Sequence, residues 1–544
     1  VVLSMVSGPE PISMLVEKAV DGRLDIPEFQ RGFVWRSDQV KALVDSLFRN
    51  YPIGQILLWR NKNYVSPRST LNGLVDVSWI VDGQQRTTAL CLLFKRKPYW
   101  YDSKDWNDRV EKIEVYFNVV PQGGVFNFSL RSASIENKPE WVGVSDILNL
   151  DKTELASKAR AIVKKMGVDS DERFTQIFNS IQQLHSLTEK TVYEQEIAHV
   201  PEDVAEIFGR LNSAGTKVKE ADIFIALMAA RNKDWVRTKF LPFIDDLEED
   251  GFELEPGIFV RTMTSIAVGK ADLEDVGNDF WSQNLMDNWT KTEDVITDVI
   301  QSLRQKGILN SDILPSKNAL IPLFILRSKF GSSIKFDHAF YWFLLASRDG
   351  RYGGSSNTIL TTDAQTILKA SSFEGAVKSL LGELSTTDVI DQPDFMTTYN
   401  RDKFLAMLTY LTIFDKGAMD WLEQDRRIGY DKSNAVLNRG FKPEWNHFFP
   451  KGKRVLRAAG YDFTDEEVNA LANITVITER ANRTISSNPP ETYISKLKIP
   501  TPYLDQQLLP KSRPFKTGKY REFLKERSLL LAQAANDYLK KLKP

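Results

Sequence analysis

The stretch WIVDGQQRTTALCLLF, residues 79–94, constrains the fold of this chain more than any other part of the sequence. It begins with apolar and β-branched residues typical of a central strand, and it ends with the apolar pattern of a helix. Between the two lie polar residues and Gly83, which permits a sharp reversal of the chain. The stretch therefore predicts a strand followed directly by a helix, with a polar turn at the carboxyl end of the strand.

The composition of this turn is that of an anion site. The first backbone N–H groups of a helix are unpaired, and the helix dipole favours an anion there. Arg86 adds a planar, permanently charged guanidinium suited to phosphate, Asp82 could hold a metal ion or a water, and Gln84 and Gln85 could orient a nucleophile or read a base. Alternatively, Asp82 caps the helix and Arg86 pairs with a nearby carboxylate, and the turn alone does not decide between the two.

Two other loops also place an arginine beside an amide side chain. In IPEFQRGFVW, Gln30 and Arg31 lie among aromatic residues that include Trp35. In EIFGRLNSAGTKVKEADI, Arg210 and Asn212 lie where one predicted helix gives way to a loop. Together with the first turn, these loops predict one converging anion pocket. The chain lacks the GxxxxGK[ST] pattern, which excludes an ordinary P-loop.

The length of 544 residues, 42% of them hydrophobic, is too great for one core and predicts three domains. We expect mixed strands and helices in residues 1–235, an almost wholly helical segment in 236–415, and strands and loops again in 416–544. No apolar run is long enough to cross a bilayer, and the first residues lack the features of a signal peptide. Because the chain begins with Val1 rather than Met, we expect that residues were removed ahead of it or that it is part of a longer chain.

Cysteine usage and charge add two further expectations. A single cysteine, Cys91, rules out an internal disulfide and fits the cytoplasm, where we expect it to be a small core residue. Residues 431–544 carry 21 Lys and Arg against 12 Asp and Glu, a net charge of +9, while the whole chain carries −1. A basic C-terminal quarter is expected if that part binds a polyanion, although solvated lysines on surface helices would give the same count.

A second constellation lies in that basic quarter. His447, in PEWNHFFPKGKR, is surrounded by basic residues and turn formers, and an imidazole can take a proton from water near neutral pH. Asn473 precedes a predicted strand, and Asn482 follows it. A histidine, then an asparagine, then a late asparagine is the order of HNH, or ββα-metal, nucleases. In that order the histidine activates water, the first asparagine fixes a loop, and the last residue binds a divalent ion.

This region also has simpler explanations. His447 could be a surface histidine stacked on Phe448 or Phe449. The acidic run TDEEVNAL needs no metal, because Thr464 and Glu467 have the spacing of a capping box.

The series IPEFQRGFVW, YPIGQILLW, IVDGQQRTTAL and IFGRLNSAGTKVKEADI resembles the DGQQR domain of GmrSD-type restriction proteins, a group that includes phosphorothioate-sensing SspE-like proteins. The resemblance covers roughly residues 10–230. It implies a ParB/sulfiredoxin-like fold that binds and hydrolyses a nucleoside triphosphate, with GTP favoured. It also implies a signature loop, formed by Asp82, Gly83, Gln84, Gln85 and Arg86. The further pocket candidates that it implies are Gln30, Arg31, Trp35, Arg210 and Asn212.

Residues 440–495 resemble the nuclease domain that accompanies DGQQR domains in the same group. By that resemblance His447 is the general base, Asn473 the loop-fixing residue and Asn482 a ligand of Mg²⁺ or Mn²⁺. The group usually has Asp or Glu immediately before the histidine, as a metal ligand, whereas this chain has Asn446. An amide oxygen is uncharged, so Asn446 would bind a metal more weakly.

These observations predict an α+β protein. We expect a ParB/sulfiredoxin-like N-terminal domain, a mostly helical middle, and a C-terminal ββα-metal domain with flanking helices. The predicted function is an anti-phage, modification-sensing DNA endonuclease that nicks or cuts phage or modified DNA. In it the nucleotide-binding domain regulates the nuclease. The alternatives are a nucleotide-dependent DNA-binding switch or clamp with a degenerate nuclease site, and a scaffold protein. The sequence leaves open whether the chain forms a homo-oligomer.

Overall fold

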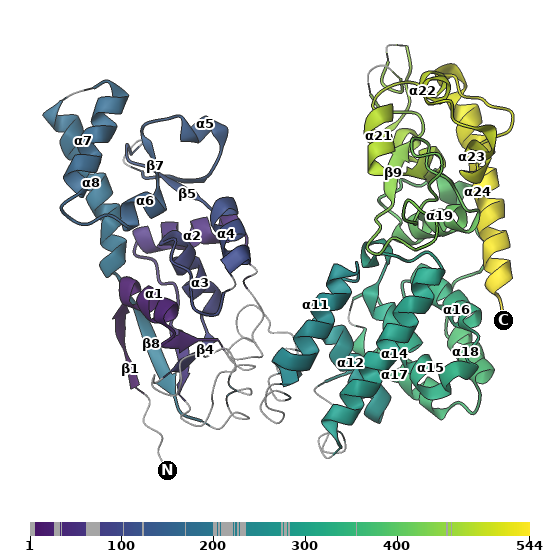
Figure 1. The fold of residues 1–544 in the computed structure, drawn as a ribbon, viewed down its shortest axis with the longest axis horizontal. Coiled ribbons are helices and arrows are strands. Elements are labelled where there is room, and N and C mark those ends of the chain that lie inside the picture. The colour runs from purple at the N-terminus through teal and green to yellow at the C-terminus, as the bar shows by residue number, and fades with distance from the viewer. Residues whose placement is uncertain are drawn as a thin grey trace. The chain divides into compact units, whose positions relative to one another are not determined.

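The chain, seen in a computed structural model, divides into two compact units, Val1–Thr238 and Lys239–Pro544 (Figure 1). The residues that the structure describes are 6–26, 33, 35–60, 77–101, 103–121, 125–168, 170–199, 204, 207, 221, 224, 225, 228, 235–273, 276, 280, 283–354, 356–452, 455–458 and 460–544. Within these ranges, no helix has both the length and the apolar character needed to cross a membrane. The finer division into three domains stays a prediction.

The first unit is built on a five-stranded sheet. In spatial order its strands are β1 (Val6–Pro11), β8 (Thr191–Ile197), β3 (Ile56–Arg60), β4 (Ser78–Asp82) and β2 (Leu24–Asp25). β3 runs parallel to β8 and antiparallel to β4, β2 runs parallel to β4, and β1 is antiparallel to β8. The carboxyl end of β4 therefore lies at the same edge of the sheet as the N-terminal ends of β3 and β8.

Three helices pack on one face of this sheet, and their apolar residues form a single core with Ile56, Leu58 and Ile80. They are α1 (Ile12–Asp21), α2 (Ser37–Phe48) and α3 (Gln84–Leu93). Cys91 of α3 is fully buried there, as expected, and burial raises the pKa of its thiol to about 12. Leu57, Trp59, Trp79 and Val81 form a smaller cluster on the opposite face.

The rest of the first unit extends the main core. A second, antiparallel sheet has the order β6 (Phe128–Leu130), β5 (Val115–Asn118) and β7 (Trp141–Gly143). The helices around it are α4 (Ser103–Lys112), α5 (Ala133–Glu136), α6 (Val144–Leu148), α7 (Leu155–Met166) and α8 (Asp171–His185), followed by the short helix η1 (Ser186–Glu189). α7 packs against α8, and α8 leads through η1 into β8.

The second unit begins with a helical part. Its main helices are α11 (Leu241–Glu249), α12 (Pro256–Val268), α14 (Leu285–Gln305), α15 (Leu320–Phe330), α16 (Phe336–Asp349), α17 (Asn357–Lys369), α18 (Phe373–Gly382) and α19 (Lys403–Asp415). The short helix η2 (Val236–Phe240) includes the last residues of the first unit and the first of the second. Short helical turns of the second unit are η3 (Ser311–Ile313), η4 (Lys317–Ala319), η5 (Gly331–Ser333) and η6 (Gln392–Met396). α15 is central, because it packs against α12, α14 and α17.

The last part of the second unit contains a strand pair and further helices. β9 (Glu444–His447) pairs antiparallel with β10 (Ile474–Ile477), and α21 (Glu479–Ile485) follows one residue later and contacts β9. The remaining elements are α20 (Asp465–Asn469), η7 (Leu471–Asn473), α22 (Pro490–Leu497), α23 (Thr501–Gln506), η8 (Thr517–Lys519) and α24 (Tyr520–Leu542). α24 packs on α16 and α19, so the C-terminal helix joins this part to the helical one.

The predicted mixture of helix and sheet is confirmed. β9 and β10 pair and α21 follows them, although α20 and η7 lie between the two strands in the sequence. The ParB/sulfiredoxin-like and ββα-metal identities of the two ends of the chain stay predictions.

Candidate functional site

The predicted strand-to-helix turn is present. β4 ends at Asp82, Gly83 has φ +99°, and α3 begins at Gln84. A Cβ atom on Gly83 would lie 2.4 Å from Cδ1 of Ile56, so both the backbone conformation and the space require glycine. The N-cap position of α3 is Gly83, which has no side chain, and Asp82 before it accepts a hydrogen bond from Arg86. The alternative in which Asp82 also caps this helix stays a prediction.

Arg86 is held in the turn by two contacts. Its Nη2 donates to Oδ2 of Asp82 at 2.8 Å, and its Nη1 donates to the carbonyl oxygen of Ile53 at 2.6 Å. Gly54, at φ +83°, lets the guanidinium approach, since a Cβ there would lie 2.4 Å from Nη1. The alternative in which Arg86 pairs with a carboxylate is therefore realised, with Asp82 as the partner. A guanidinium has five N–H donors, so an anion can still bind to it.

The other residues predicted for this pocket are only partly within the described residues. Gln84 is buried and Gln85 is half-buried at the start of α3. Trp35 is half-buried and packs against the main core of the unit. Four more candidates lie outside the described residues: Gln30, Arg31, Arg210 and Asn212. The convergence of three loops on one pocket stays a prediction.

In the second unit, Asn473 fixes the backbone that follows His447. Asn473 is fully buried, immediately before β10. Its Oδ1 accepts from the N–H of Phe449 at 2.9 Å, and its Nδ2 donates to the carbonyl oxygens of Phe449 at 3.1 Å and Val468 at 3.0 Å. One side chain thus satisfies three buried backbone groups. This geometry is what a loop-fixing residue requires.

His447 ends β9, and its ring is oriented by a second asparagine. Its Nε2 lies 3.1 Å from Oδ1 of Asn469, whose Nδ2 donates to the carbonyl oxygen of Asp465 at 2.8 Å. Because that contact leaves Oδ1 as the acceptor, Nε2 of His447 carries the proton and Nδ1 keeps its lone pair. The imidazole and the ring of Tyr399 are nearly perpendicular, with centroids 5.4 Å apart.

The surroundings of His447 keep its imidazole neutral. Burial, aided by the charge of Lys451 and opposed by the hydrogen bond to Asn469, lowers its pKa to about 4. The ring contact seen for His447 is with Tyr399, whereas Phe448 and Phe449 are fully buried against Phe523 of α24.

Asn482, the metal-ligand candidate, contacts a carboxylate that sequence reasoning missed. Its Nδ2 lies 2.7 Å from Oε1 of Glu444. Asn446 lies on the same face of β9 as Glu444 but is 3% exposed, and its Nδ2 donates to Oγ1 of Thr475 at 2.9 Å. Asn446, immediately before the histidine, thus contacts the neighbouring strand, whereas Glu444, two positions before Asn446, contacts α21. The period of two in a strand could have indicated Glu444.

Glu444 and Asn482 are suited to a hard cation. Carboxylate and amide oxygens are ligands that Mg²⁺ accepts, and Mg²⁺ usually takes only one or two carboxylates and completes its shell with water and substrate phosphates. Among the residues that the structure describes, no three His, Cys, Asp or Glu side chains come together as a closed metal cage. Glu444 and Asn482 therefore could supply two ligands to a cation whose other ligands would be water and the phosphate oxygens of a bound substrate.

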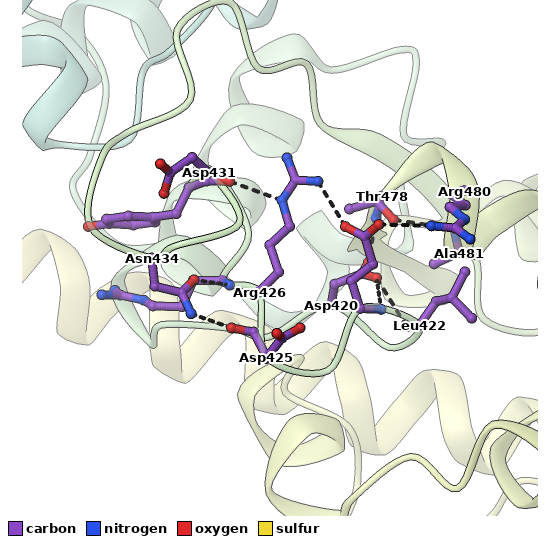
Figure 2. Close-up of polar contacts among 12 residues, drawn as sticks. Asp420, Leu422, Asp425, Arg426, Asp431, Asn434, Thr478, Arg480 and Ala481 are labelled. Carbon is purple, nitrogen blue, oxygen red and sulfur yellow. Dashed lines mark hydrogen bonds and ion pairs between the residues drawn. The ribbon is translucent and has the colours of Figure 1, made fainter.

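A polar network ties the start of α21 to the segment 420–434 (Figure 2). Asp420 is fully buried, and its Oδ1 accepts from the N–H of Thr478 at 2.8 Å. Its Oδ2 accepts from the N–H groups of Leu422 at 3.0 Å and Glu423 at 2.8 Å. Thr478 in turn caps α21, through the N–H of Ala481. The position of Asn482 therefore depends on a loop far from it in the sequence.

Arg527 of α24 also supports the antiparallel pair of β9 and β10, called the hairpin below. It is fully buried, and its guanidinium donates to the carbonyl oxygens of Ala472 at 2.9 Å, Ile474 at 2.5 Å and Gln507 at 3.2 Å. Burial without a carboxylate partner lowers its pKa to about 9. Two of these carbonyls flank Asn473, so the C-terminal helix fixes the start of β10.

Comparison with known proteins gives a family match within the first unit. Residues 12–229 match the family model described as the N-terminal domain of the GmrSD restriction endonuclease. An uncharacterised protein of Methanocaldococcus jannaschii is 21% identical over 532 residues, which cover 89% of this chain and 86% of the relative. The similarity to that relative therefore extends through both units.

Proposed function

From the premise that residues 12–229 form a GmrSD-type N-terminal domain, we propose that this chain is a restriction-type DNA endonuclease. Its first unit binds a nucleoside triphosphate, and its second unit cuts DNA. The observation that carries the nuclease assignment is the hairpin in which Asn473 fixes the backbone after His447 while Asn469 orients the imidazole. The basic composition of residues 431–544 supports a polyanionic substrate.

In the proposed reaction His447 is the general base. Its Nδ1 takes a proton from a water molecule, whose oxygen attacks the phosphorus while the bond to the leaving sugar oxygen breaks. Asn469 keeps the proton on Nε2, so that the basic nitrogen is Nδ1, the one that Asn469 does not contact. A Mg²⁺ or Mn²⁺ held by Glu444 and Asn482 would stabilise the charge that develops on the phosphate and the leaving oxygen.

In the first unit the polar turn is proposed to bind the phosphates. The backbone N–H groups at the start of α3 and the guanidinium of Arg86 meet the anion, and Asp82 would shift from Arg86 to a cation bound by the phosphates. Gln84 and Gln85 lie close to the same helix end. We infer that hydrolysis of the triphosphate, with GTP favoured by the family resemblance, regulates cutting and that the substrate is modified or phage DNA.

The decisive experiment incubates the purified chain with Mg²⁺ or Mn²⁺ and plasmid, with and without each triphosphate. The plasmid is plain, glucosylated at hydroxymethylcytosine or phosphorothioate-modified. His447→Ala should lower the cleavage rate by about 10² to 10⁴, the usual contribution of a general base. His338→Ala, which changes a half-buried histidine of α16, should cut like the wild type. Absence of cutting on every DNA would reject the nuclease assignment.

One observation favours a second candidate function. The residue before His447 is the buried, uncharged Asn446, so the site lacks the usual carboxylate ligand there. A nucleotide-dependent DNA-binding switch with a degenerate nuclease site would follow. Triphosphate-dependent DNA binding that survives His447→Ala, with no strand scission by the wild type, would establish this function in place of the first.

A further inference from the structure

A pocket opens at the edge of the main sheet where β4 ends and β3 and β8 begin. Its volume is about 620 Å³, which is within the range of small-molecule sites. Its walls are the loop 50–55 that leads into β3 and the residues 189–193 that lead into β8. Nothing in the reaction proposed above uses this pocket.

Two tyrosines of the pocket are exposed. Tyr51 is 59% exposed and Tyr193 is 62% exposed, and both line the pocket. In the described part of the chain neither ring packs on another aromatic ring or a cation, and neither hydroxyl has a partner. Tyrosine rings this exposed leave their faces open to a planar ligand.

The pocket lies directly behind the proposed phosphate site. Ile53 and Gly54 line it, and the same two residues hold Arg86, through the carbonyl of Ile53 and the close approach over Gly54. A ligand with its phosphates at the start of α3 and a ring in the pocket would therefore need to reach only across Ile53 and Gly54.

The charged side chains that line the pocket each have a hydrogen-bond or ion-pair partner. Lys190 donates to the carbonyl oxygen of Leu47 and to Oδ1 of Asn50, the latter at 2.5 Å, and Glu189 pairs with Lys152. Both partners of Lys190 are neutral oxygens, so the pocket wall keeps one positive charge. Beside it the pocket offers aromatic and apolar surface with Nδ2 of Asn50 and Oε1 of Gln55, since Oδ1 of Asn50 accepts from Lys190 and Nε2 of Gln55 donates to Gln195. Such a surface is the chemistry that recognises a nucleobase.

We propose that this pocket binds the base of the nucleoside triphosphate, stacked on Tyr51 or Tyr193, while Arg86 and the start of α3 hold the phosphates. The inference rests on the proposed triphosphate site and adds the recognition of the base. Every base has a flat face, so stacking gives affinity with little selectivity, and the amides supply what discrimination there is.

The test compares a nucleotide with its phosphates alone. Calorimetry with the full-length chain measures the affinity for GTP, for ATP and for inorganic tripolyphosphate. At least one of Tyr51→Ala and Tyr193→Ala, the one that removes the stacking ring, should weaken the binding of both nucleotides by about tenfold. Tripolyphosphate should bind all variants equally, which also reports that they are folded. Tyr51→Phe and Tyr193→Phe should retain the affinity, since they keep the ring.

Tyr461→Ala, which changes a 42% exposed tyrosine of the second unit, is the matched control and should leave all three affinities unchanged. Equal affinities for GTP in the wild type and both alanine variants would overturn the base pocket and leave the phosphate site intact. Equal affinities of the wild type for GTP and tripolyphosphate would do the same. A wild type that binds none of the three would overturn the triphosphate site itself, and the pocket with it.

Discussion

The protonation of His447 gives the sharpest prediction, because burial shifts its pKa from 6.5 to about 4. In the unfolded chain this imidazole would gain its proton as the pH falls through 6.5, whereas in the folded chain it stays neutral down to about 4. The unfolded state therefore binds more protons in this window, and the free energy of unfolding decreases as the pH is lowered. The shift of roughly 2.5 pH units corresponds to about 3 kcal/mol of unfolding free energy, lost between pH 6.5 and 4.

Nuclear magnetic resonance measures this pKa directly. The chain has four histidines, so a sample labelled only in histidine gives few signals, and His447→Gln identifies the one of interest. The signal should titrate near pH 4, and its nitrogen shifts should report a proton on Nε2. The free energy of unfolding is then measured by chemical denaturation at pH 7 and pH 4. Between these two pH values the wild type should lose about 3 kcal/mol more than His447→Gln.

Subtracting the pH dependence of His447→Gln from that of the wild type cancels the contribution of the carboxylates, which titrate in both proteins. A measured pKa near 6.5, or identical pH dependence of the two unfolding free energies, would refute the argument from burial. It would mean that the imidazole is more exposed in solution than its contacts with Asn469 and Tyr399 indicate.

Three further predictions follow from single contacts. Gly54→Ala should displace Arg86 and weaken triphosphate binding in calorimetry, because its Cβ would lie 2.4 Å from Nη1 at a φ of +83°. Arg527→Met should lower the unfolding free energy of the second unit by about 3 kcal/mol in chemical denaturation, since buried carbonyls lose their donor. Asn469→Asp should raise the pKa of His447 above 4 in the same titration, because a carboxylate opposite Nε2 favours the charged ring.

Each of these has a matched control or a contrary outcome. Gly8→Ala adds a Cβ with nothing within 4 Å and should leave triphosphate binding unchanged. Lys525→Met changes an exposed residue of the same helix as Arg527 and should leave stability nearly unchanged. If Gly54→Ala binds triphosphate like the wild type, Arg86 does not hold the phosphates. A pKa of His447 that Asn469→Asp does not move would show that the two side chains do not meet in solution.

The sequence alone determined those elements whose stabilising interactions join residues a few positions apart in the chain. The strand that ends at Asp82 and the helix that begins at Gln84 follow from an apolar run, a glycine at positive φ and a helical pattern, all within 16 residues. The capping box of Thr464 and Glu467 is confirmed for the same reason, since its two hydrogen bonds join residues three apart. Such features are stabilised by interactions that the chain can make almost anywhere in the fold.

Only the tertiary structure decided which side chains meet around the candidate catalytic hairpin. His447 and Asn469 are 22 residues apart, Glu444 and Asn482 are 38 apart, and Arg527 and Ile474 are 53 apart. Nothing in the local sequence of either partner indicates the other, because these pairs form only when β9, β10, α21 and α24 pack together. A hydrogen bond between distant residues depends on the energy of the whole fold, whereas a turn or a cap depends on a few adjacent dihedral angles.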